Sequence, residues 1–256
     1  MRAFPHRPSA EILRASKAGV LEYLQKSEAR REDALALPDP SYFWMRGEQL
    51  TLRGMLEYAE EQPPTTVVAT WRSAAGEFAA ALELGQPPVP WDAWTLPLHA
   101  LAANLVPLAH FFASLPEKLW IGPDPQSRFW TIAQAKALSA LVRLDGQESE
   151  RWIGVLGELA SADPPPAIVK DDPPWYGNQA AVLSAVVRNS AGDFNQSLAK
   201  RMELRTQSLL RHGSNSPLGF LDLDALGLCR LALDRGLQPT VQHPYLPLEI
   251  LRIAPE

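Results

Sequence analysis

Hydrophobic residues recur along this chain at intervals of three and four positions, the spacing that places them on one face of an α-helix. The pattern predicts about nine helices joined by short, proline-rich turns. Alternating strand patterns are scarce, and only residues 238–242 are suited to a short extended piece. The expected helices cover residues 10–34, 47–61, 65–84, 93–114, 126–144, 148–161, 177–188, 193–212 and 222–235.

Several of the expected helix ends carry recognisable signals. Ser9 is suited to cap the first helix, because its side-chain oxygen can accept a hydrogen bond from a free backbone amide. The Pro-Asp-Pro run at 38–40 should stop that helix, since proline cannot continue a helix and restricts the residue before it. Gly85 is suited to end the third helix, and Pro107 should kink the helix over residues 93–114.

The last expected helix, over residues 222–235, is apolar on most of its sides. A helix with this pattern is buried, so we expect it at the centre of the fold. Cys229 lies on it and should be a buried, unreactive thiol. Asp222 and Asp224 stand at its start, where Asp222 can cap the helix and both charges complement the helix dipole.

These elements predict an all-α fold, a compact antiparallel helical domain with proline-rich connectors that spans residues 1–256. The two Pro-Asp-Pro runs at 38–40 and 123–125 have flanks that do not match each other. A helical solenoid, which needs internal repeats, is therefore the minor alternative.

Composition narrows the functional classes. The chain has 24 basic and 29 acidic side chains, a net charge of −5, and one cysteine. The charge argues against nucleic acid as a partner, and a single cysteine excludes an internal disulfide framework and a multi-cysteine metal site. Most of the eight tryptophans stand at the beginnings of expected helices or beside prolines, where packing at helix junctions explains them without a ligand. We expect no cofactor, and the pattern makes no prediction of the oligomeric state.

The sequence also bears on location. The first residues contain no apolar run of the kind that a secretory signal needs. The most apolar long stretch, residues 94–115, contains two histidines and an asparagine and is broken by Pro97 and Pro107. We therefore expect a cytoplasmic protein with no membrane partner.

The familiar catalytic motifs are missing from the sequence: it holds neither a Gly-rich phosphate loop nor a Gly-x-Ser-x-Gly elbow nor His-Glu-x-x-His. His99 and His110 are expected on one helix, but 11 residues of helix separate them by roughly 16 Å, too far to share a metal. We therefore predict a protein that is not an enzyme, with no catalytic residue and no metal site.

Acidic residues concentrate between Asp145 and Trp175, a segment that contains seven acidic and two basic residues. This window includes an expected loop from Asp163 to Pro174 that prolines stiffen, and it ends in two aromatic residues. A stiff acidic loop with aromatic anchors is suited to bind a basic protein. The candidate partner-binding residues are Asp163, Asp171, Asp172, Trp175 and Tyr176. The alternative is a solvated loop in which Trp175 packs into the core.

The C-terminal part contains Phe-Leu-Asp-Leu-Asp-Ala-Leu-Gly-Leu at 220–228, Ala-Leu-Asp-Arg-Gly-Leu at 232–237, Pro-Tyr-Leu-Pro at 244–247, and Leu251. This segment resembles the immunity protein 49 family, bacterial proteins that are largely helical and are encoded beside polymorphic or contact-delivered toxins. The resemblance implies that the chain neutralises a cognate toxin by binding it. It carries over no catalytic residue and does not indicate which surface binds.

Three functional hypotheses follow. The first is an immunity protein that blocks a cognate protein toxin through a protein–protein interface, and the second is an all-α helical-repeat adaptor that binds another protein. The first predicts a compact globule, and the second predicts a continuous concave groove. The third is a helical enzyme with dispersed catalytic residues, which would require a deep pocket that holds His99 or His110 beside a carboxylate with a perturbed pKa.

Overall fold

The computed structural model describes residues 9–37, 39–121, 129–212 and 221–253. Within these ranges the chain forms twelve α-helices and two short 3-10 segments, and it contains no strand, so the all-α prediction is confirmed. The elements are α1 (Ala10–Glu28), α2 (Arg31–Ala36), α3 (Pro40–Ala59), α4 (Pro64–Glu83), α5 (Pro90–Ala102), α6 (Val106–Ala113), η1 (Glu117–Leu119), α7 (Phe129–Val142), α8 (Gly146–Ser161), α9 (Ala167–Asp171), α10 (Pro173–Val187), α11 (Ala191–His212), α12 (Leu223–Asp234) and η3 (Leu248–Arg252).

The sequence pattern located most helices but merged some of them. The helix expected over residues 93–114 is two helices, because Asn104 adopts a left-handed backbone (φ 59°) and ends α5 before Pro107 begins the first turn of α6. The helix expected over residues 10–34 is likewise divided into α1 and α2. A further short helix, α9, occupies the segment that was expected to be a loop.

The caps explain where several helices begin. Ser9 accepts a hydrogen bond from the Ile12 amide at 3.2 Å, as predicted. The Pro-Asp-Pro run at 38–40 also starts a helix, which the prediction missed: Asp39 caps α3, and Pro40 occupies its first turn. Gly85 has φ +94° and follows the end of α4, as expected.

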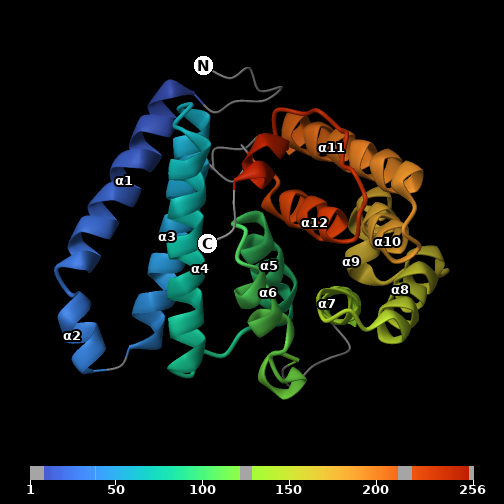
Figure 1. Cartoon of the computed structure of the whole chain (residues 1–256), viewed down its shortest axis with the longest axis horizontal. Helices are drawn as coiled ribbons and strands as arrows, with labels where there is room; N and C mark the ends of the chain where they lie inside the picture. The colour runs from blue at the N-terminus through green and yellow to red at the C-terminus, as the bar shows by residue number, and fades with distance from the viewer. Residues whose placement is uncertain (1–8, 38, 122–128, 213–220, 254–256) are drawn as a thin grey trace.

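The helices are arranged as a long pair, α3 and α4, flanked by α1 and α2 on one side and by α5 to α12 on the other (Figure 1). α4 leads to α5 and α6, and the chain then forms the pairs α7–α8 and α10–α11. α12, near the C-terminus, packs against α5, so two elements far apart in the sequence are in contact. Residues from α1 through η3 contribute to one large buried cluster.

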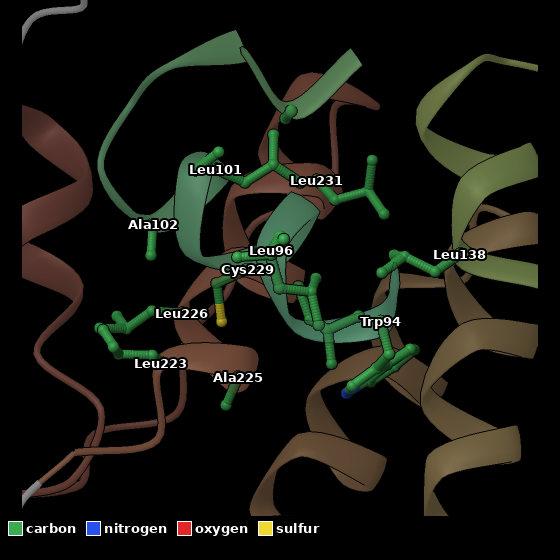
Figure 2. Close-up of a cluster of buried hydrophobic side chains, with 14 of the residues drawn as sticks. Trp94, Leu96, Leu101, Ala102, Leu138, Leu223, Ala225, Leu226, Cys229 and Leu231 are labelled. Atoms are coloured by element: carbon green, nitrogen blue, oxygen red, sulfur yellow. The ribbon is translucent and has the colours of Figure 1, made fainter. Parts of the chain in front are cut away.

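α12 is buried, as its sequence predicts. Leu226 and Cys229 of α12 are fully enclosed, and Figure 2 shows them packed with Leu96 and Leu101 of α5. Gly227 lies directly against the α5 backbone: a Cβ placed on it would stand 2.3 Å from the carbonyl oxygen of Leu98. The two helices can approach this closely only because residue 227 has no side chain.

Among the described residues, no helix is both long enough and apolar enough to span a membrane. The assignment of residues 1–256 to a single domain stays a prediction, which a single cooperative unfolding transition would support.

Candidate functional site

The structure distributes the five predicted partner-binding residues over three elements. Asp163 is exposed in the turn after α8, and Asp171 is the last residue of α9, with a side chain outside the described part. Asp172 caps α10: its side-chain oxygen accepts a hydrogen bond from the Trp175 amide at 3.3 Å. The expected long loop is therefore replaced by a short helix followed directly by another helix.

The two aromatic residues of this group pack inward and are half-buried. The Arg201 guanidinium carbon lies 4.6 Å from the centre of the Trp175 ring. Tyr176 packs edge-on against Trp130, with ring centres 5.3 Å apart. Through these two rings, α10 packs against neighbouring helices. This matches the alternative in which Trp175 packs into the core. The five residues therefore do not form one exposed cluster. Their role in binding stays a prediction.

Arg201, which packs on the Trp175 ring, also forms a buried ion pair. Its guanidinium donates two hydrogen bonds to the Asp222 carboxylate, at 2.8 and 2.9 Å. Asp222 also caps α12 by accepting from the Ala225 amide at 2.9 Å. The side chains of Arg201 and Asp222 are each 2% exposed, so this pair is enclosed by the core. We call Arg201, Asp222, Trp175 and Asp224 the buried ionic centre.

Electrostatics hold this centre in its charged form. Burial alone would raise the pKa of Asp222, but the positive charges of Arg201 and Arg205, together with the hydrogen bonds it accepts, outweigh burial and lower the pKa to about 2. Asp224 extends the centre towards α5, where it accepts a hydrogen bond from the Trp94 indole at 3.0 Å. The same carboxylate lies 3.4 Å from His99 Nε2.

The sequence analysis found only the capping role of Asp222. It missed Arg201, because the two residues pair across 21 positions and only the fold brings α11 beside the start of α12. The two histidines expected on one helix lie on different ones, with half-buried His99 on α5 and exposed His110 on α6. Cys229 is buried as predicted, and burial raises the pKa of its thiol.

A second feature, which we call the α3–α5 groove, is an open depression of about 370 Å³. α4 packs against both α3 and α5, and its Phe78 contributes to the lining between them. Trp44 and Glu48 of α3, one helical turn apart, line one side, and Trp91 and Asp92 of the first turn of α5 line the other. His99 lines the same groove farther along α5.

Neither carboxylate of the α3–α5 groove is paired with a lysine or an arginine of the described chain. Asp92 accepts a hydrogen bond from the Val89 amide at 2.8 Å, and Glu48 is exposed. Burial raises the pKa of Asp92 and outweighs the Val89 hydrogen bond and the nearby His99, which lower it; the charge of Glu48 acts in the same direction as burial. Neither carboxylate forms an ion pair within the described part of the chain. Tryptophan was expected to be packed at helix junctions, but Trp91 is 51% exposed.

Residues 154–250 match the family model described as Immunity protein 49. This C-terminal segment is similar to immunity protein 49.

The match confirms the resemblance and extends it upstream to include the second half of α8 and all of α9, α10 and α11. Arg201 and Asp222 both lie inside the immunity protein 49 segment, whereas Trp94, His99 and the α3–α5 groove lie outside it. No curated protein and no solved structure matches the chain significantly. Among the described residues, no group of three or more His, Cys, Asp or Glu side chains is arranged to hold a metal ion.

Proposed function

We propose that this chain is a cytoplasmic immunity protein that binds a cognate bacterial toxin and blocks it through a protein–protein interface. The observation that carries this proposal is the match of residues 154–250 to immunity protein 49. A protein of this kind acts by presenting a complementary surface to its toxin, so the proposal requires no chemical step.

The surface charge favours a basic toxin. Glu150 and Glu158 on α8 and Asp163 after it are exposed, and none of them forms an ion pair within the described ranges. We call these three residues the acidic surface; in the sequence they precede Asp171 and Asp172, which were predicted to contact the partner. Unpaired charges of one sign attract an oppositely charged protein over several ångströms and speed its approach.

The packing argues against the adaptor alternative. In a solenoid each repeat contacts only its neighbours in the sequence. Here α12 packs against α5, and the buried ionic centre joins α10, α11 and α12 while Asp224 continues it to Trp94 of α5. Such long-range contacts are those of a globular fold.

One observation favours the enzyme alternative: His99 lines an open groove and lies 3.4 Å from Asp224. The hydroxyl of Thr51, which lines the same groove, donates to the Gly47 carbonyl of its own helix at 2.9 Å and is therefore not activated by His99. If His99 were catalytic, His99→Gln would abolish protection against the toxin while leaving the complex intact. We expect both protection and complex to survive this substitution.

The direct test of the proposal is co-expression of the chain with the toxin encoded beside it. We expect a stoichiometric complex on size-exclusion chromatography and restored growth of cells that express the toxin. The proposal fails if no complex forms and growth is not restored.

Variants of the acidic surface test how the partner approaches. Glu158→Lys together with Asp163→Lys should slow association and reduce its dependence on salt, with little change in the dissociation rate. Asp172 is a poor choice for this test because its replacement would also remove the cap of α10. Stopped-flow binding at several salt concentrations measures the effect, and an unchanged association rate would remove this surface from the account.

A further inference from the structure

The α3–α5 groove combines two tryptophans with two carboxylates, and the basic residue in its described lining is His99. Its lining residues in the described part of the chain include no lysine and no arginine. The basic residues of α3 are engaged elsewhere: Arg46 pairs with Glu28 and Glu77, and Arg53 pairs with Glu57. Glu48 and Asp92 are therefore not paired with a lysine or an arginine of the described chain, and the basic side chain that acts on Asp92 is His99.

The same protein shows what such a set of side chains holds when a cation is present. In the buried ionic centre, Arg201 lies over the Trp175 ring at 4.6 Å while it pairs with Asp222. In a second, largely buried cluster, Lys136 lies over the Trp152 ring at 4.5 Å while it pairs with Glu117 at 2.7 Å. An aromatic face attracts a cation, and a neighbouring carboxylate adds a charge-assisted hydrogen bond.

The surroundings of the groove have the character of a protein interface. Met45 beside Trp44 is 46% exposed, and Val89 beside the first turn of α5 is 44% exposed. Leu84, at the end of α4, is 38% exposed. Exposed tryptophan and methionine are enriched at protein interfaces, and an aromatic anchor beside a pocket is typical of a residue that dominates binding energy.

We propose that the α3–α5 groove receives an arginine or lysine side chain of the toxin, held between Trp44 and Trp91 and paired with Glu48 and Asp92. This inference rests on the proposed function, since it names the contact through which the immunity protein would hold its partner. The acidic surface would speed the encounter, whereas the groove would set how long the complex persists.

The first test measures the complex of the full chain with the toxin encoded beside it. Trp91→Ala should weaken this complex by about tenfold or more, mainly through faster dissociation. Glu48→Gln should weaken it by about three- to tenfold. Leu37→Ala, which removes another exposed apolar side chain, is the matched control and should change the affinity by less than about twofold. Unchanged affinity in both groove variants would overturn the proposal.

The second test needs no toxin and separates the groove from the proposed function. The chain, labelled with nitrogen-15, is titrated with the peptide acetyl-Gly-Arg-Gly-amide, with acetyl-Gly-Gln-Gly-amide as the uncharged control. We expect the indole signal of Trp91 to shift with the arginine peptide alone, and Glu48→Gln to reduce this shift. Absence of a shift, or an equal shift with both peptides, would contradict a groove for cations.

The two tests together separate the possible failures. If the wild-type chain does not bind the neighbouring toxin, the proposed function fails, and the peptide titration alone decides whether the groove takes a cation. If the wild-type chain binds the toxin and the groove variants bind it equally well, the function stands and the groove is excluded as the contact.

Discussion

The buried ionic centre and the α3–α5 groove contain the same kinds of side chain but differ in their exposure to solvent. Each combines tryptophan with two carboxylates, but the centre contains Arg201 and is closed, whereas the groove has no lysine or arginine among its described lining residues and is open. The centre lies in the segment similar to immunity protein 49, apart from its contact with α5, and the groove lies in the N-terminal half. In the centre, Arg201 fills the cluster and makes it a structural contact; in the groove, we propose that a basic side chain of the partner takes the corresponding place.

The largest effect on the free energy of unfolding is expected when the buried ionic centre is disrupted. Arg201→Met should lower the free energy of unfolding by about 3–5 kcal/mol, because it leaves the charge of Asp222 buried with only Arg205 nearby, at 3.9 Å. Urea denaturation followed by circular dichroism measures this loss. The double variant Arg201→Met with Asp222→Leu should lose less than the single variant, since no unpaired charge remains. A loss below 1 kcal/mol in Arg201→Met would contradict the structural role of the pair.

The next effect concerns the close packing of α12 on α5. Gly227→Ala should lower the free energy of unfolding by about 1–3 kcal/mol, because its Cβ would overlap the Leu98 backbone, which can move only with the whole of α5. Gly154→Ala on the exposed side of α8 is the matched control: a Cβ there meets nothing within 4 Å. We expect the control to raise the free energy of unfolding by about 0.4–1 kcal/mol. Equal effects at the two glycines would refute the close approach.

A third effect is the acid dependence of stability. The pKa of Asp222 is lowered to about 2 in the folded chain, below the ordinary value of 3.8, so its stabilising contribution is complete above about pH 4. That contribution is lost as the pH falls from about 4 towards 2, because the unfolded chain takes up the proton first. Urea denaturation between pH 2 and pH 5 should show the gap between wild type and Asp222→Asn narrowing as the pH falls. A constant gap would contradict the low pKa.

The smallest expected effect on stability is in the groove. Trp91→Ala should change the free energy of unfolding by about 0.5 kcal/mol or less, since half of this side chain is already in water. Trp175→Ala, which removes the ring that packs on Arg201, should cost roughly 2–3 kcal/mol. Thermal denaturation of the two variants compares them, and similar losses would remove the distinction between a structural and an exposed tryptophan.

The fold was largely predictable from local patterns, because hydrophobic periodicity and capping residues act over a few positions. The all-α class, the Ser9 cap and the buried α12 followed from this information. The break at Asn104 did not, because a left-handed asparagine within an apolar stretch leaves the periodicity unchanged. The start of α3 at Pro40 was missed for a related reason: proline is a stop signal within a helix and a start signal in its first turn.

The candidate sites were less predictable, because they depend on contacts between distant segments. The acidic segment was visible as composition, but the inward packing of Trp175 depends on Arg201 of another helix. Trp91 was attributed to packing because it stands beside Pro90, and only the arrangement of α3, α4 and α5 shows that its ring faces solvent. Sequence composition can identify residues suited to binding, but it does not show which of them the fold leaves free.

We propose that this chain silences a toxin by binding it, and growth of cells that produce the neighbouring toxin is the decisive measurement. We expect the wild-type chain to rescue growth, and Trp91→Ala, at equal expression, to rescue it less well. Growth arrest that the wild-type chain does not relieve, with the toxin and the chain both present and folded, would refute binding as the basis of protection.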